Sequence, residues 1–199
     1  MNPKEPRLDS QFAFLMEIDK LKNITRATTL ADASRSENSA EHSWHICLFA
    51  LTLAEYADKP VRMDRVIKML LLHDIVEIDA GDHPIHLAFD AAKVEAEEAA
   101  AADRLFGLLP KEQGQEYRAV WDEFEAAQSN DAVFAKAIDR LAPVLQNLHS
   151  GGASWLEYRP TLAQIESRVG VKVTRGAPRL WSHIKQQVTD FFHANGLED

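Results

Sequence analysis

The stretch LLLHDIVEIDAGD, residues 70–82, decides how the rest of the chain is interpreted. It begins as an apolar helix, then places His73, Asp74 and Glu77 within about one turn, and ends at Gly81-Asp82. Buried polar groups cost free energy unless they are paired, and adjacent histidine and aspartate are both good ligands for a divalent metal. Helical positions i, i+3 and i+4 share a face, so Glu77 should project to the side of the other two. The stretch therefore predicts a metal site.

Length and composition favour one domain with a sizeable core. The chain has 199 residues, which is long for one domain and short for two. Its formal net charge is −9, and it lacks the Lys/Arg patch that neutralises phosphates, so we expect no nucleic-acid partner. A small anionic substrate is still allowed, because a few arginines and a metal can reverse the potential inside one cleft.

The cellular location is predicted from what the sequence lacks. The single cysteine, Cys47, lies in an apolar run, where we expect a buried core thiol and no disulfide or zinc site of the CxxC type. The N-terminus has no apolar leader, and no apolar run approaches the ~18 residues of a membrane span. We therefore expect a cytoplasmic protein with no membrane partner.

Apolar residues recur at helical spacing along most of the chain. We expect helices at about residues 10–23, 40–56, 60–80, 89–109, 116–128, 131–150, 160–169 and 178–194, with Ser39 capping the second. No convincing stretch alternates with a period of two. The predicted fold is an all-α helical bundle, one domain over residues 1–199, with its core at about 10–150 and C-terminal helices at about 160–194.

Two further segments bear on function. Residues 24–40 lose apolar periodicity and predict a long loop, and loops of this length often bind ligands. The fixed positive charges of this loop are Arg26 and Arg35. The acidic run Glu95–Glu98 is interpreted as a solvated helix face, or otherwise as part of a site rim.

Four candidate metal ligands come from three predicted helices: His42, His73, Asp74 and Asp139. Two histidines and two carboxylates on packed helices are the kind of set with which bundles hold a metal. The alternatives are a buried hydrogen-bonded pair at positions 73 and 74, and a partnership of Asp139 with its basic neighbours. His45, His83 and His86 raise the alternative of a second metal, although we expect His45 to pack behind the site and the other two to lie in a loop.

Taken in order, three segments resemble a known family. They are AEHSWH (40–45), LLLHDIVEIDAGD (70–82) and AIDRL (137–141), and their pattern H…HD…D is that of the HD-domain metal-dependent phosphohydrolases. The run HDxxExxxGD, preceded by RSENSAEH (35–42), is similar to the bacterial 5'-deoxynucleotidase branch. The resemblance covers roughly residues 10–150.

The resemblance implies roles for particular residues. It implies one divalent ion, of manganese, cobalt, magnesium, zinc, iron or nickel, held by His42, His73, Asp74 and Asp139. It also implies that Glu77 and Asp82 act near the metal-bound water or the leaving group, in an order that stays open. The phosphate contacts that it implies are Arg26 and Arg35.

The implied activity is hydrolysis of the phosphomonoester of nucleoside 5'-monophosphates by the metal-bound water. The related branch usually has an aromatic residue near the sugar, directly after the first loop arginine, whereas here Ala27 and Thr28 follow Arg26. The choice between ribose and deoxyribose is therefore open. The alternatives are another phosphate substrate (a phosphodiester, an alarmone or a nucleoside triphosphate) and a metal- and nucleotide-binding sensor without turnover. The resemblance and the amphipathic helices together suggest a homodimer.

Overall fold

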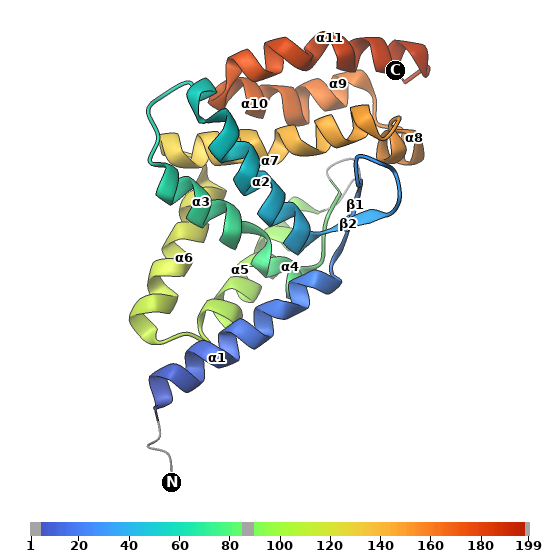
Figure 1. Ribbon diagram of the computed structural model, residues 1–199. Helices are drawn as coiled ribbons and strands as arrows, with labels where there is room; N and C mark the ends of the chain where they lie inside the picture. The colour runs from blue at the N-terminus through green and yellow to red at the C-terminus, as the bar shows by residue number, and fades with distance from the viewer. Residues whose placement is uncertain (1–4, 85–89, 198–199) are drawn as a thin grey trace.

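A computed structural model describes residues 5–84 and 90–197 of the chain, and helices dominate it (Figure 1). The all-α prediction is confirmed, apart from one small two-stranded sheet. The longer helices are α1 (Pro6–Ile18), α2 (Ser39–Leu53), α3 (Met63–Leu72), α5 (Ala91–Phe106), α6 (Lys111–Ala126), α7 (Asn130–His149) and α11 (Pro178–Ala194). The shorter ones are α4 (Glu77–Ala80), α8 (Ala153–Tyr158), α9 (Leu162–Ile165) and α10 (Val171–Gly176).

Helix α7 runs through the centre of the molecule, with helices on both sides of it (Figure 1). Helices α10 and α11 pack on one side, while α2, α3 and α6 pack on the other. Its apolar stripe explains this position, because Ala137, Ile138 and Ala142 are completely buried. The cysteine prediction is also confirmed, since Cys47 is buried and burial raises the pKa of its thiol to about 11.

The predicted loop at residues 24–40 is a β-hairpin. Strand β1 (Thr25–Thr29) pairs antiparallel with β2 (Ser36–Asn38), with an irregularity in the register between them. The strands are too short and polar to show the alternation that identifies a strand in a sequence. Their threonines are β-branched, which suits a pleated surface. The hairpin gives the arginine-bearing segment a fixed path beside the helices.

Helix α2 begins one residue earlier than predicted, and its cap is different. Asn38, not Ser39, accepts from the backbone N–H of Glu41, and the Glu41 side chain accepts in return from the Asn38 backbone N–H. This is a capping box, which satisfies two free N–H groups of the first turn. The Ser39 hydroxyl is therefore left available for another acceptor.

The C-terminal segment contains more structure than its sequence predicts. Helices α8 and α10 were not expected, and a π-helical turn over Glu166–Gly170 joins α9 to α10. Gly170 lies where a Cβ atom would come within 2.6 Å of the Trp181 ring, so the close packing of α11 requires glycine there. Within residues 5–84 and 90–197, no helix is long and apolar enough to cross a membrane.

Candidate active site

The stretch around His73 is not one continuous helix. Helix α3 ends at Leu72, a 3-10 helix covers His73–Val76, and α4 begins at Glu77. The tighter turn is fixed by Trp121, whose indole N–H donates to the His73 carbonyl at 3.2 Å. The imidazole itself lies edge-on to the Phe124 ring, with centroids 5.0 Å apart. Contacts from α6 therefore hold the motif in a conformation that helical periodicity alone does not predict.

Three predicted ligands from three elements converge in the interior. One ligand atom each from His42, His73 and Asp139 lies within 4.8 Å of the others, and all three residues are buried. The His42 Nε2 atom lies 3.1 Å from Asp139 Oδ1, and the His73 Nε2 atom lies 3.7 Å from the same oxygen. The donors are thus close enough to share one ion.

The orientation of both imidazoles fits metal ligation. His73 Nδ1 must carry a proton, because it donates to the Leu70 carbonyl at 2.9 Å, and this leaves Nε2, which faces the carboxylates, as the atom at which a metal would replace a proton. Buried His73 Nε2 has no hydrogen bond among the described residues. His42 Nδ1 lies 3.3 Å from Glu37 Oε2, which is within ion-pair distance but outside the geometry of a hydrogen bond. Such outer partners are typical of metal-binding histidines.

Asp74 is the fourth predicted ligand and lies between the histidine and an arginine. Its Oδ1 atom is 2.8 Å from His73 Nε2, while Oδ2 accepts from Arg26 Nη1 at 2.8 Å. The donor types therefore fit a divalent metal: two imidazoles and the Asp139 carboxylate converge, and Asp74 lies beside His73 at the edge of that group.

Arg26 projects from β1 into the same place. Its Nη1 atom also lies 3.7 Å from Glu77 Oε1 and 3.8 Å from Asp82 Oδ1. Burial alone would lower the pKa of the guanidinium, but the surrounding carboxylates, Asp74 first, outweigh burial and raise it. A permanent positive charge is thus held at the edge of the ligand cluster.

The ligand cluster is strongly polarised. Burial would lower the pKa of His73, but the Asp74 and Asp139 carboxylates raise it to about 10. Burial would likewise raise the pKa of the Asp74 and Asp139 carboxyl groups. His73 and Arg26 outweigh burial and lower the pKa of Asp74. Arg140 and the two histidines lower the pKa of Asp139. Both carboxyl groups are therefore anionic at neutral pH, as metal ligands must be.

The two predicted acid/base residues have the opposite shift. Burial and the neighbouring charge of Asp74 raise the pKa of Glu77 to about 9, against the opposing effect of Arg26. The same causes raise the pKa of Asp82. Glu77 Oε2 accepts from the Ser39 hydroxyl at 2.5 Å, and Asp82 Oδ2 accepts from the Ala27 backbone N–H at 3.3 Å. At Glu77 the rise is large enough for the carboxyl group to hold a proton at neutral pH.

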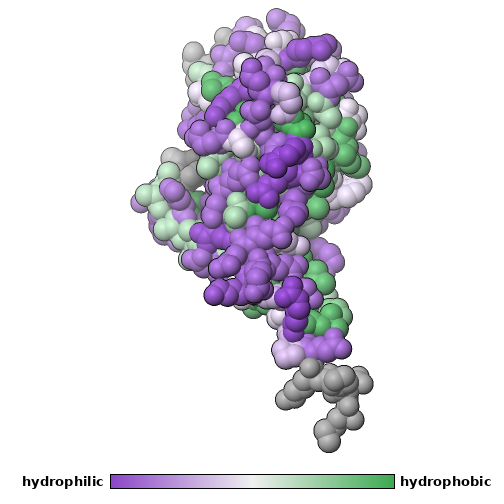
Figure 2. Space-filling model, turned by 90° about the vertical axis from the view of Figure 1, so that its left-hand side faces the viewer, coloured by the Kyte–Doolittle hydropathy of each residue, from purple (hydrophilic) through white to green (hydrophobic). Residues whose placement is uncertain are grey.

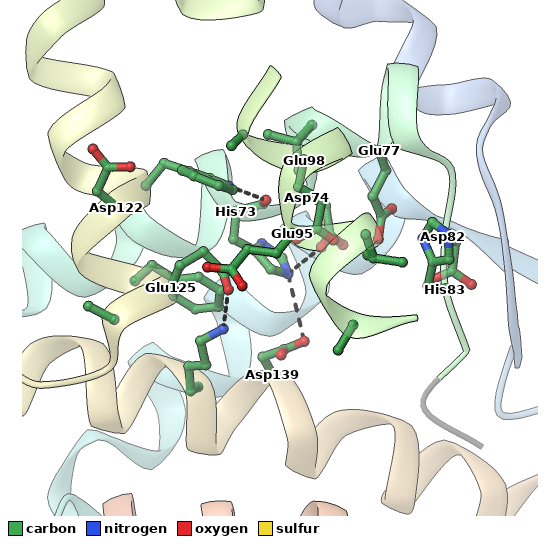
Figure 3. A pocket seen from close by; sticks show the side chains of 18 of the residues that line it. His73, Asp74, Glu77, Asp82, His83, Glu95, Glu98, Asp122, Glu125 and Asp139 are labelled. Carbon is green, nitrogen blue, oxygen red and sulfur yellow. Dashed lines mark hydrogen bonds and ion pairs between the residues drawn. The ribbon is translucent and has the colours of Figure 1, made fainter. Parts of the chain in front are cut away.

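Three of the four candidate ligands, His73, Asp74 and Asp139, line a cavity of about 670 Å³. Figure 3 shows them with Glu77 and Asp82 to one side and Asp122 and Glu125 to the other, and Glu95 and Glu98 of α5 line the same cavity. The acidic run of α5 therefore contributes to the site rim, the second of the two interpretations of the sequence. The volume lies within the roughly 300–1,000 Å³ of small-molecule sites.

The remaining predicted residues do not all join the site. Arg35 is exposed, and its guanidinium pairs with Glu41 through bonds of 2.8 and 2.7 Å, away from the cavity lining. His45 lies between the rings of Trp44 and Phe49. His83 lines the cavity, and His86 lies outside the described residues.

Glu37 is a residue of the site that the sequence did not single out. It is 1% exposed, and its Oε1 atom accepts from Gln146 Nε2 at 2.9 Å. Its other oxygen faces His42, as described above, and lies 3.9 Å from Arg26 Nε. The only signal in the sequence was its place in RSENSAEH, within a segment that was expected to be a loop.

Comparisons with known proteins find a family and several relatives. The HD domain family matches residues 18–181, which extends beyond the segment recognised from the motifs into the C-terminal helices. The 5'-deoxynucleotidase of Pectobacterium atrosepticum is 26% identical over 82% of this chain and 85% of its own. The 5'-deoxynucleotidase of Xenopus laevis is 30% identical over 70% of this chain and 68% of its own.

A solved structure is more similar still. The crystal structure of a predicted metal-dependent phosphohydrolase from Magnetospirillum magnetotacticum is 47% identical, with a TM-score of 0.90. The alignment covers 98% of this chain and all of that one. The fold therefore recurs in a protein of nearly the same length.

Proposed function

Because the chain belongs to the HD domain family, we propose that it is a metal-dependent phosphohydrolase that releases phosphate from nucleoside 5'-monophosphates. The names of its 5'-deoxynucleotidase relatives and of the similar phosphohydrolase structure support this activity. One observation carries the proposal: His42, His73 and Asp139 converge beside Asp74 at the floor of a cavity large enough for a nucleotide.

The metal would be held by His42, His73, Asp74 and Asp139. Bound there, a divalent ion would activate water as a nucleophile at neutral pH and polarise a phosphoryl oxygen. The protein contributes the orientation of its ligands, through the Leu70 carbonyl behind one imidazole and Glu37 behind the other. The ligand types suit several divalent ions, so metal identity is a matter for experiment.

Arg26 is proposed to bind the phosphate. It is fixed by β1, it is buried, and its guanidinium lies among the carboxylates at the edge of the ligand cluster. A phosphate entering the cavity would meet this group, whose planar set of N–H donors matches phosphate oxygens. For Arg35 we propose a structural role instead, since its pair with Glu41 holds the end of the hairpin against the first turn of α2.

Glu77 is proposed as the proton donor to the departing 5'-oxygen. Its raised pKa keeps it protonated at neutral pH, and the Ser39 hydroxyl fixes its position. Asp82 is held by the Ala27 backbone and is proposed to accept the proton of the attacking water. This assignment separates the roles of two carboxyl groups that the sequence left equivalent.

The experiment is phosphate release from ribo- and deoxynucleoside 5'-monophosphates. Protein stripped of metal would be reloaded separately with manganese, cobalt, magnesium, zinc, iron or nickel. We expect turnover only after reloading. The ratio of the rates on ribo- and deoxynucleotides shows how strongly the site selects the sugar with Ala27 in place of an aromatic residue. Arg26→Ala should lower kcat/KM by roughly 10²–10³-fold if the guanidinium stabilises transition-state charge, while Arg35→Ala serves as the matched control and should change it little.

Two outcomes would contradict the proposal. Turnover unchanged in Asp74→Ala, with the fold retained by circular dichroism, would remove the metal cluster from the reaction. Hydrolysis of a phosphodiester, an alarmone or a nucleoside triphosphate, with no phosphate released from any monophosphate, would point to the other substrate class, and tight binding with no product would point to a sensor.

A homodimer is also proposed. Trp44, Leu48 and Leu51 lie on one face of α2 at helical spacing and are 62%, 44% and 56% exposed. Figure 2 shows a mainly hydrophilic face, with apolar surface gathered along one edge of the molecule. Contiguous exposed apolar surface is typical of protein contacts. Sedimentation should give twice the monomer mass, and Trp44→Glu should reduce it to one; a wild-type monomer at micromolar concentration would refute the dimer.

A further inference from the structure

One wall of the cavity is basic. Lys136 and Arg140 lie four residues apart on α7, and therefore on one face of that helix, and Lys172 comes from α10, which packs on α7. All three line the same 670 Å³ cavity as the metal ligands. In a protein of net charge −9, three cations therefore line the same cavity as the candidate metal ligands.

The wall formed by α5 and α6 is mainly acidic. Glu95 and Glu98 come from α5, and Asp122 and Glu125 from α6 (Figure 3); α6 also contributes Arg118, which pairs with Asp122 at 2.8 Å. Burial and the charge of Glu125 raise the pKa of Glu98, as expected where carboxylates crowd together. An anion in the cavity would therefore be repelled by α5 and α6 and drawn toward α7 and α10.

Among the described residues, Lys136 forms a hydrogen bond with a carboxylate, whereas Arg140 and Lys172 do not. Lys136 pairs with Glu125 at 2.9 Å and lies over the Phe124 ring. Arg140 Nε lies 3.5 Å from Asp139 Oδ2 but has no hydrogen-bond partner among the described residues, and Asp139 is a metal ligand. Lys172 forms no ion pair with any residue in the described ranges. Positive charge is therefore in surplus at Arg140 and Lys172.

This surplus is unfavourable in the absence of a ligand. The guanidinium of Arg140, followed by burial and by Lys136, lowers the pKa of Lys172 to about 8. A bound anion would relieve the repulsion and favour the charged amine. Clustered cations at a cavity wall are a common way of holding phosphate.

We propose that Arg140 and Lys172 form a second anion subsite, which takes a second phosphoryl group on the nucleotide, beyond the 5'-phosphate that is cleaved. The inference rests on the proposed function, because it concerns the substrate of the same cavity. Arg26 is left for the scissile phosphate, since it lies among Asp74, Glu77 and Asp82 at the ligand cluster. The expected ligand is a nucleotide with two phosphoryl groups, either a 3',5'-bisphosphate or a 5'-diphosphate.

The test is a binding measurement that does not require turnover. Metal-loaded Glu77→Gln protein would be titrated by calorimetry with deoxyadenosine 5'-monophosphate, 3',5'-bisphosphate and 5'-diphosphate. We expect at least one two-phosphate ligand to bind about tenfold more tightly than the monophosphate. The further change Lys172→Ala should reduce that advantage to less than threefold while leaving monophosphate affinity within about twofold.

The matched control is Lys185→Ala in the same Glu77→Gln background. Lys185 is an exposed lysine on α11 that pairs with Glu166 at 2.8 Å, outside the cavity lining. It should preserve the full advantage. Comparing the affinities of the 3',5'-bisphosphate and the 5'-diphosphate shows whether the second phosphoryl group is attached at the 3' or at the 5' position.

The subsite is refuted if both two-phosphate ligands bind no more tightly than the monophosphate, or if the advantage survives Lys172→Ala. Failure of the proposed function has a different signature, because wild-type metal-loaded protein would then release no phosphate from any monophosphate.

Discussion

Glu37→Gln should weaken metal binding without unfolding the protein. Glu37 accepts from Gln146 with one oxygen and faces His42 Nδ1 with the other at 3.3 Å. A glutamine has one oxygen and one NH₂ group, so it can accept from only one of these donors, and its NH₂ group must face the other. It also loses the charge that stabilises a proton on Nδ1.

The magnitude follows from the position of Glu37 behind a ligand. Changes in such outer residues typically cost 10–100-fold in metal affinity, which corresponds to about 1.4–2.7 kcal/mol. The assay is competition for manganese or zinc with a chromophoric chelator, with circular dichroism to verify the fold. Glu41→Gln is the control, because Glu41 is near in sequence but pairs with exposed Arg35.

Unchanged metal affinity in Glu37→Gln would refute this reasoning, and so would an equal loss in the Glu41 control. The first result would mean that the Leu70 carbonyl and packing suffice to orient the ligands. The second would mean that the effect comes from the hairpin as a whole and not from the contact with His42.

Three more predictions concern protonation, metal linkage and packing. Burial and Asp74 raise the pKa of Glu77 to about 9, and its proton-donor form exists below that pKa, so kcat should fall as pH rises through it. A bound metal's positive charge should lower the pKa of this limb below 9, and Glu77→Gln should abolish the limb in a pH–rate profile. Saturating metal at about 100 times its Kd should stabilise the fold by about 2.7 kcal/mol, raising Tm by roughly 5–11 °C in a scan, and Asp74→Ala should remove most of the increase. Gly151→Ala and Gly152→Ala both place alanine at positive φ, but only at Gly152 would the Cβ atom meet the Phe191 ring, at 2.0 Å. In urea titrations, Gly152→Ala should therefore lower the free energy of unfolding by about 1–3 kcal/mol more than Gly151→Ala does. Equal losses would mean that the ring moves aside freely.

The candidate metal ligands could be recognised in the sequence because they lie on, or directly after, helices with apolar faces. Helical periodicity identifies such elements, and titratable groups on their buried faces need a reason to be there. The prediction that Glu77 shares the side of His73 is also consistent with the structure, although the helix changes to a 3-10 turn between them. Contacts with Trp121 cause that change, and they are not local in sequence.

The hairpin and the basic wall could not be predicted in the same way. Strands of five and three residues have too few positions for a period to be recognised. Lys172 follows a π-helical turn near the C-terminus, and only the packing of α10 on α7 brings it to the cavity. The expected cytoplasmic location and the lack of nucleic-acid binding stay predictions.

The hairpin has a consequence for how this sequence can vary. Arg26 lies on β1, Glu37 lies on β2, and His42 follows in the first turn of α2. The hairpin therefore sets the position of three site residues. Because side chains alternate across a strand, inserting a single residue into either strand would turn its charged group to the opposite face. Length changes during evolution should therefore be confined to the tip, at residues 30–35, and a library of insertions selected for activity should be enriched there and depleted from both strands.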